Sequence, residues 1–168
     1  MSNESFERGK ETELRYQPYL DQYYKSLGWD YEHITDERQK ELDVDRIVHW
    51  AEDREFYTED KYVNDENYNR VFLETIQNSI VGSIGWIYVC RAKYIFYTFC
   101  NDTYLRVLKF DRKELKQWFN EHHWYYPEIT AHREVTKPKG LLVPISAFPS
   151  SVLLDKDYFC ISNKEEEK

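Results

Sequence analysis

The chain has 168 residues and a formal net charge of −8, because 31 acidic side chains outnumber 23 Lys and Arg. This length suits one domain with a sizeable core, and fifteen Tyr, nine Phe and five Trp provide apolar surface to fill it. Glycine and proline are scarce, with five of each, which excludes a collagen-like or linker-rich architecture.

A helix is predicted near the start of the chain, over residues 12–27. Three apolar side chains share one side of it at helical spacing: Leu20, Tyr24 and Leu27. Glu13 falls on the same side, where a carboxylate that faces the core needs a partner, so Glu13 is a candidate site residue. Pro18 predicts a kink or a restart within this helix.

Strands are predicted from apolar and alternating patterns at the following residues: 29–34, 42–50, 56–63, 70–77, 94–99, 104–110 and 141–145. The second and third should form an antiparallel pair, and residues 35–40 should be a polar connection. Pro144 predicts an edge position for the last strand. A second helix is expected over residues 112–122, with Asp111 and Glu114 forming a capping box at its start.

This order of helix, strands and helix predicts an α/β fold, in which a mixed β-sheet is flanked by helices. A parallel connection is expected somewhere after the fourth strand. Residues 1–162 should form a single domain. Residues 163–168, which include consecutive Glu side chains, should be a charged and disordered tail.

The antiparallel pair of strands carries the most informative side chains. Asp45 precedes an apolar run, and Glu59 and Lys61 are two positions apart. Alternate residues of a strand share a face, so Glu59 and Lys61 should point one way and Asp60 the other. Two carboxylates and an ammonium can hold a divalent cation beside a polarised water, as metal-assisted phosphodiester cleavage requires. The competing interpretation is a solvent-facing charge pair, which is ordinary on a sheet with one wet face.

These residues resemble the PD-(D/E)xK nuclease superfamily, which has the restriction-endonuclease-like fold. Asp45 is similar to the family's Asp at the start of an apolar strand half, and Glu59-Asp60-Lys61 is similar to its (D/E)xK element. Glu13 stands where many members add a Glu on the first helix. Three further stretches look like small phage-type members: residues 72–75, 85–88 and 92–95.

The resemblance implies a Mg²⁺-dependent deoxyribonuclease, in which Mn²⁺ can substitute for Mg²⁺. The implied catalytic residues are these: Asp45, Glu59, Lys61 and Glu13. The first two would bind the metal, and the backbone carbonyl of Asp60 and the carboxylate of Glu74 are further candidate ligands. Lys61 would orient the attacking water and stabilise charge on the phosphate. Asp43 shares the predicted face of Asp45 and is the alternative to it as a ligand.

DNA is the expected substrate, with RNA or a protein partner as alternatives. A homodimer is considered because one small domain has little surface with which to encircle a duplex. Trp86 or Tyr88 could stack on a base. Basic side chains that could contact phosphates are scattered along the chain: Arg91, Lys93, Lys109, Arg112, Lys113, Lys116, Lys137 and Lys139. The acidic charge suits protein binding or DNA mimicry better, so the second hypothesis is a catalytically inactive module, such as a phage-encoded inhibitor.

Other classes of protein find no support in the sequence. Zinc-finger spacing, a P-loop, a dinucleotide fingerprint and a serine-hydrolase elbow are all missing. The apolar stretch at residues 84–90 is too short to span a bilayer, and the first residues lack the apolar core of a signal peptide. Three cysteines form an odd, sparse set, in which Cys90 and Cys100 should be buried thiols. We therefore expect a cytoplasmic protein with no membrane partner.

Overall fold

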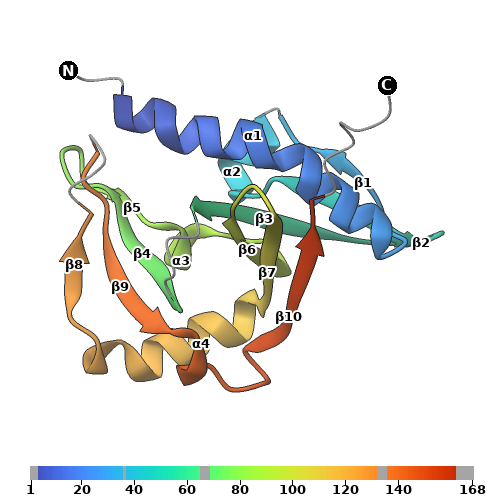
Figure 1. Cartoon of the computed structure of the whole chain (residues 1–168). Coiled ribbons are helices and arrows are strands. Elements are labelled where there is room, and N and C mark those ends of the chain that lie inside the picture. The colour runs from blue at the N-terminus through green and yellow to red at the C-terminus, as the bar shows by residue number, and fades with distance from the viewer. Residues whose placement is uncertain (1–3, 36, 65–68, 132–135, 162–168) are drawn as a thin grey trace.

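The protein is described by a computed structural model that covers residues 4–35, 37–64, 69–131 and 136–161. Two β-sheets lie between a long helix, α1 (Glu4–Ser26), and a shorter one, α4 (Arg112–His122), as Figure 1 shows. The α/β class predicted from the sequence is confirmed, with a mixed sheet and flanking helices. Among the described residues, no helix is both long and apolar enough to cross a bilayer.

The larger sheet has six strands. In spatial order they are β1 (Asp30–His33), β2 (Arg46–Ala51), β3 (Arg54–Asn64), β6 (Tyr94–Cys100), β7 (Tyr104–Asp111) and β10 (Leu153–Cys160). β3 and β6 run parallel, and every other neighbouring pair in this sheet is antiparallel. The predicted parallel connection therefore lies between β3 and β6, and the chain between them forms part of the second sheet.

The second sheet has four antiparallel strands. Their spatial order is β5 (Ser83–Ile84), β4 (Arg70–Asn78), β9 (Lys139–Pro144) and β8 (Glu128–Thr130). Short helices join these strands to the larger sheet: α3 (Trp86–Val89), η1 (His123–Tyr125) and η2 (Ile145–Ala147). The second sheet curves over one face of the larger sheet, while α1 crosses the opposite face (Figure 1).

Apolar side chains fill both faces of the larger sheet. On the α1 face, Leu20 and Tyr24 pack with Val48 and Phe96, and all four are fully buried. On the other face the buried cluster joins the larger sheet to β4, β9 and α4, through Ile95, Leu108, Leu73, Val143 and Leu115. The larger sheet is thus covered on both sides near its middle, which leaves its strand ends and edges for polar groups.

The predicted connection at residues 35–40 and the predicted start of the second strand are wrong. The helix α2 (Glu37–Leu42) occupies most of this region, since the polar residues there are mainly good helix formers. Asp43 follows the helix with a positive φ of 50°, a left-handed conformation that a β-strand does not accommodate. β2 therefore begins at Arg46, and Asp43 and Asp45 lie in an irregular segment before it.

The predicted edge position of the strand with Pro144 is also wrong, because β9 lies between β4 and β8. Pro144 is tolerated since it is the last residue of β9, where a missing N–H interrupts little of the ladder. The strands β8 and β10 were not predicted. β10 is an edge strand whose residues are mostly exposed and partly charged, so its sequence shows no clear alternation of apolar and polar side chains.

Several other expectations are confirmed. The first helix is confirmed, although it begins at Glu4 and not at residue 12, and it continues through Pro18 without the restart that was one of the two predicted effects of this proline. The Asp111 carboxylate caps α4 by accepting a hydrogen bond from the Glu114 N–H at 2.9 Å. Cys90 and Cys100 are buried free thiols. The predicted tail at residues 163–168 lies outside the described residues.

Candidate functional site

The candidate site forms at the start of β2, where the β2–β3 ladder stops and β3 continues with only β6 beside it. The ladder between these strands ends at the pair Arg46 and Thr58, whereas β3 runs on to Asn64. Asp45 takes the next place beside β3: its N–H donates to the Thr58 carbonyl at 2.8 Å, and its carboxylate accepts from the Asp60 N–H at 2.7 Å. The irregular segment before β2 thereby holds a carboxylate against the open edge of β3.

Glu59 and Lys61 lie on the same face of β3, as predicted. Lys61 Nζ is 2.5 Å from Glu59 Oε1, and the two side chains are 26% and 5% exposed, respectively. Lys61 also lies over the buried ring of Trp86, with its Nζ 5.7 Å from the ring centroid. The carboxylate and ammonium therefore face the interior between the two sheets, and the competing interpretation of a solvent-facing pair is wrong.

Asp43 and Cys90 complete the cluster around Glu59. One ligand atom from each of Asp43, Glu59 and Cys90 lies within 4.8 Å of the other two. A backbone hydrogen bond of 3.0 Å from the Arg91 N–H to the Leu42 carbonyl joins the segments that carry Asp43 and Cys90. From the sequence, Asp43 is only an alternative ligand and Cys90 a core thiol. Their approach depends on two helices, α2 and α3, that are too short to be recognised from a hydrophobic period.

The pKa values of three residues in this cluster, Glu59, Asp43 and Lys61, are all raised. Burial raises the pKa of Glu59 well above its usual range, and Asp45 and Asp43 add to the rise against the opposing effect of Lys61. Burial likewise raises the pKa of Asp43. For Lys61, burial alone would lower the pKa, but the Glu59, Asp43 and Asp45 carboxylates outweigh it and raise the pKa. Burial is the main reason that Glu59 and Asp43 hold their protons more tightly, and the excess of carboxylates over the one ammonium adds to it. A divalent cation would relieve that excess of negative charge.

Glu13 approaches the cluster from α1. Partial burial raises its pKa, as does the charge of Asp45, while Lys61 lowers it. Its neighbours on the predicted stripe, Leu20 and Tyr24, are fully buried, although Leu27 at the end of the stripe is 39% exposed. Glu13 itself is exposed, and α1 covers the face of the larger sheet opposite Glu59, so the core-facing position predicted for Glu13 is wrong. The charges of Asp45 and Lys61 nevertheless act on it.

Asp60 points to the opposite face of β3, as predicted, and its side chain serves the fold. Its carboxylate accepts from Arg46 Nε at 2.5 Å and from the Tyr24 hydroxyl at 2.8 Å. Arg46 is fully buried, and its guanidinium lies 4.4 Å and 4.8 Å from the ring centroids of Tyr24 and Tyr31. Only the backbone of Asp60 is left to serve a metal, in agreement with the ligand atom that the sequence analysis named.

Glu74 lies in β4, on the second sheet, and its side chain is half-buried. Tyr97, which is paired with Lys61 across β3 and β6, has a pKa raised to about 12, mainly by burial and also by the charge of Glu74. The carboxylates that act on Glu59 are instead those of Asp45 and Asp43. A metal-binding role for Glu74 stays a prediction.

The predicted nucleic-acid contacts are dispersed. Lys93 and Lys109 lie 5.2 Å and 4.2 Å from the centroid of Tyr94, whose ring packs on the α1 face, away from Glu59. Lys116 donates to the Tyr88 carbonyl at 3.1 Å. Trp86 is only 5% exposed and supports Lys61, so it does not offer a stacking surface, whereas Tyr88 is 42% exposed.

Comparison of the chain with models of known protein families, with curated proteins and with solved structures found no match. The resemblance to the PD-(D/E)xK superfamily therefore stays a prediction. The assignment of a function rests on the chemistry of the cluster itself.

Proposed function

We propose that this protein is a divalent-metal-dependent nuclease whose metal binds at the open edge of β3. The observation that carries the proposal is the set of carboxylates around the ammonium of Lys61, in which Glu59 is buried and Asp43 and Asp45 are half-buried. Burying several carboxylates together is costly unless a cation offsets them. One lysine does so only in part, and a bound metal ion would supply the rest.

Asp45 and Glu59 are the proposed ligands, with the backbone carbonyl of Asp60 as a third. The Asp60 N–H points toward Asp45, and the N–H and C=O of one strand residue face the same edge, so this carbonyl also faces the open edge. Oxygen ligands suit Mg²⁺, which keeps several waters when few carboxylates hold it. Burial and the nearby Glu59 raise the pKa of Cys90 to about 12, so its thiol is neutral at pH 7 when no metal is bound. A hard ion such as Mg²⁺ favours the oxygen ligands over this sulfur.

Lys61 is proposed to position the attacking water and to stabilise the phosphate as charge builds on it. Its raised pKa keeps it an ammonium, which is a poor general base but a good partner for a phosphate oxygen. Glu13 is proposed to accept a hydrogen bond from a metal-bound water. A metal bound there would polarise that water and neutralise charge on the phosphate.

The proposal is tested by incubating the full chain with supercoiled, linear and branched DNA and with RNA, with and without Mg²⁺ or Mn²⁺. We expect cleavage of DNA that requires the metal, and RNA cleavage is the alternative. Asp45→Asn, which can still accept the hydrogen bond from Asp60, should abolish cleavage and weaken metal binding without loss of the fold. Metal titration that is unchanged in Asp45→Asn would refute this ligand assignment.

A second candidate is a binding module that cleaves nothing. It is favoured by the net charge of −8 and by the 2.5 Å ion pair that already joins Lys61 to Glu59. Metal binding without cleavage of any DNA or RNA form would favour this candidate. A homodimer and a cytoplasmic location stay predictions under both candidates.

A further inference from the structure

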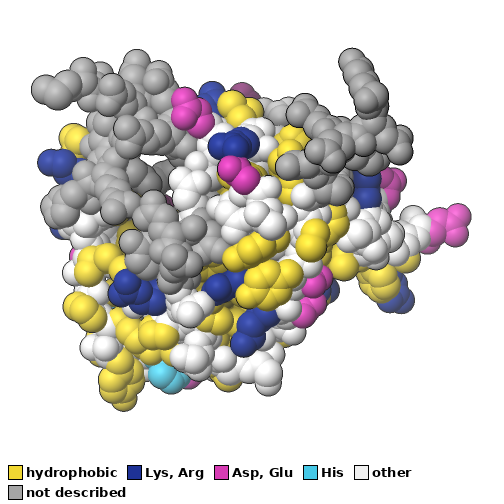
Figure 2. Space-filling view, viewed as in Figure 1, with side chains coloured by type: hydrophobic (Ala, Val, Ile, Leu, Met, Phe, Trp, Pro, Cys, Tyr) yellow, Lys and Arg dark blue, Asp and Glu magenta, His cyan; other side chains and the backbone are white. Residues whose placement is uncertain are grey.

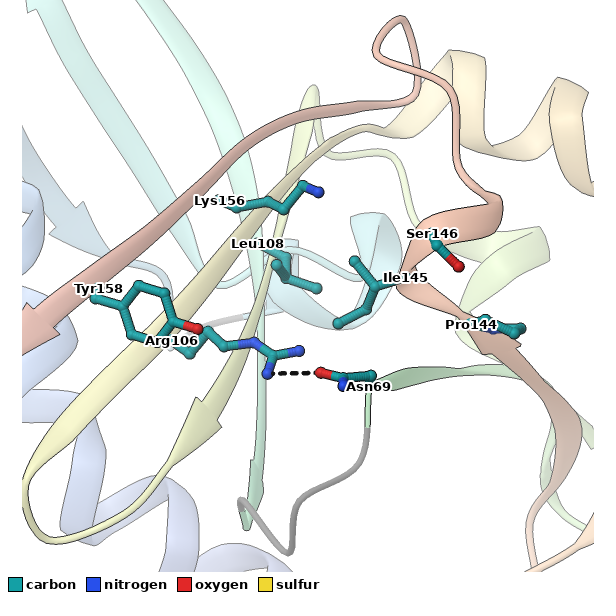
Figure 3. A pocket seen from close by; sticks show the side chains of 8 residues that line it. All are labelled: Asn69, Arg106, Leu108, Pro144, Ile145, Ser146, Lys156 and Tyr158. Atoms are coloured by element: carbon teal, nitrogen blue, oxygen red, sulfur yellow. Dashed lines mark hydrogen bonds between the residues drawn. The ribbon is translucent and has the colours of Figure 1, made fainter.

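A pocket separate from the acidic cluster opens where the two sheets diverge. It has a volume of about 400 Å³, within the range typical of small-molecule sites. Arg106 and Lys156 extend into it from β7 and β10, and Ile145 and Ser146 of η2 form the facing wall (Figure 3). The Ile145 N–H donates to the Asn69 carbonyl at 2.8 Å, which holds this wall to the start of β4.

The pocket is cationic in an acidic protein. None of the described residues that line it is acidic, and within the described part of the chain neither Arg106 nor Lys156 forms an ion pair with a carboxylate. Arg106 is held in place, since it donates to Asn69 Oδ1 at 3.0 Å and lies 4.6 Å from the centroid of Phe99. A fixed guanidinium with donors to spare is preorganised for an anion.

The rest of the lining is suited to a ring. Pro144 adds an exposed apolar side chain, and the Tyr158 side chain, 62% exposed, borders the opening beside Arg106. Ser146 adds a hydroxyl. Figure 2 shows Lys and Arg side chains among hydrophobic ones on the face over β7 and β10, so cationic and apolar surface are adjacent there.

We propose that this pocket binds a phosphate-bearing ligand of the nucleoside class. The phosphate contacts Arg106 and Lys156, and the base lies against the exposed ring of Tyr158. Arginine recognises phosphate through paired hydrogen bonds, and aromatic rings accept any base by stacking. The ligand is either a free nucleotide or a nucleotide unit of a nucleic-acid strand, since both present the same phosphate and ring.

The pocket and the acidic cluster lie on the same face of the larger sheet but do not merge. Lys61, Tyr97, Leu108 and Lys156 are successive cross-strand partners from β3 to β10, which separates the two lysine backbones by about 14 Å. Between them the buried Tyr97 hydroxyl accepts from the Phe72 N–H of β4 at 3.1 Å. The inference therefore does not depend on the proposed nuclease activity and stands or falls separately from it.

The test is a calorimetric titration of the full chain in EDTA, so that no metal contributes. The probes are thymidine 5′-monophosphate, thymidine, inorganic phosphate and an oligothymidylate. We expect the monophosphate to bind at least tenfold more tightly than thymidine or inorganic phosphate. Lys156→Gln should weaken that binding by about tenfold, as loss of a charged contact predicts, and Arg106→Gln by at least as much. Lys25→Gln, at an exposed position of α1 on the opposite face of the sheet, is the matched control and should bind as the wild type does.

The probes distinguish a free nucleotide from a nucleic-acid strand as the ligand of this pocket. Monophosphate binding as tight as that of the oligothymidylate would identify a free-nucleotide site, and binding of the oligothymidylate alone would identify a strand site, provided that Lys156→Gln weakens it. The inference is overturned if no probe binds, if thymidine binds as well as its monophosphate, or if Lys156→Gln, folded by its thermal melt, binds like the control.

Discussion

At the scale of single residues, the site depends on one lysine held among carboxylates. Lys61 contacts Glu59 Oε1 at 2.5 Å and is attracted by Asp43 and Asp45 as well. That environment keeps the ammonium charged and fixes its position. A phosphate bound to a metal at this edge would therefore meet a preorganised positive charge, the arrangement that most often lowers the barrier to phosphoryl transfer.

Lys61→Ala should reduce cleavage by about two orders of magnitude or more, the range typical of removing one preorganised charge-stabilising group. Metal should still bind, because the carboxylates remain and one repelling cation is gone. Single-turnover cleavage and metal titration measure the two effects, with Lys25→Ala, an exposed lysine of α1 on the opposite face, as the control. Equal cleavage by wild type and Lys61→Ala would place the active site elsewhere.

The raised pKa of Glu59 predicts how stability depends on pH. Unfolded Glu59 loses its proton near its ordinary value of about 4.3. The folded chain holds that proton to higher pH, so stability falls as the pH rises between the two pKa values. Lys61 adds no slope in this range, because it is charged in both states. Glu59→Gln removes the effect and should be stabilised relative to wild type by an amount that grows with pH.

Urea unfolding of wild type and Glu59→Gln at several pH values between 5 and 8, in EDTA, measures this difference. The gain can rise by at most about 1.4 kcal/mol per pH unit for one group. Added Mg²⁺ should remove it by stabilising the wild type, which binds the ion more tightly. Parallel stability profiles for the two proteins would show that Glu59 is ionised in the folded state at all these values.

At the scale of elements, a buried polar network ties α1 to the larger sheet and so positions Glu13. Arg46 of β2 pairs with Asp60 of β3 and with Asp21 of α1, both at 2.5 Å. The Tyr24 hydroxyl of α1 completes the network by donating to Asp60. An arginine that is fully buried requires its carboxylate partner, so Asp60 matters more to the fold than its place in an acidic cluster suggests.

Asp60→Ala should lower the free energy of unfolding by about 3–5 kcal/mol, because it leaves a buried charge without its partner. The double variant Arg46→Met with Asp60→Leu should recover most of that loss, since it removes both charges. Urea unfolding compares them. Arg15→Ala, which breaks an exposed pair with Asp102, is the control and should cost less than about 1 kcal/mol. A double variant as unstable as Asp60→Ala would contradict this account.

The elements also show what the sequence could predict. The two-residue period of a strand correctly placed Glu59 and Lys61 on one face and Asp60 on the other, whereas helical spacing predicted a core-facing Glu13 and the structure leaves this side chain exposed. The gathering of Asp43 and Cys90 was not predictable in this way. It depends on α2 and α3, which are too short for a hydrophobic period to appear, and on a left-handed residue at Asp43.

At the scale of the whole molecule, pairings between distant strands decide the architecture. β4 pairs with β9 across the chain, and β3 pairs in parallel with β6 around the intervening strands. Local sequence patterns identify strands, but they do not show which strands pair, or in what register, when the partners lie far apart in sequence. The second sheet was therefore not predicted. Because this sheet covers Tyr97, it separates the acidic cluster from the cationic pocket and gives the molecule two polar sites on one sheet face.

The overall charge predicts how the molecule would bind nucleic acid under the proposed function. With a net charge of −8, long-range attraction to phosphates is weak, and binding depends on the few cations that face it, Lys61, Arg106 and Lys156 among them. Neutralising about two to four phosphates of a single strand gives a slope of about −1.5 to −3 in a plot of log affinity against log salt.

In EDTA, oligothymidylate anisotropy should therefore show weak binding with a shallow salt dependence. Mg²⁺ should strengthen binding by offsetting the carboxylates, and Lys61→Gln, which should not cleave, allows this to be measured. A slope steeper than about −6, or an affinity indifferent to Mg²⁺, would indicate an extensive basic interface that this distribution of charge does not provide.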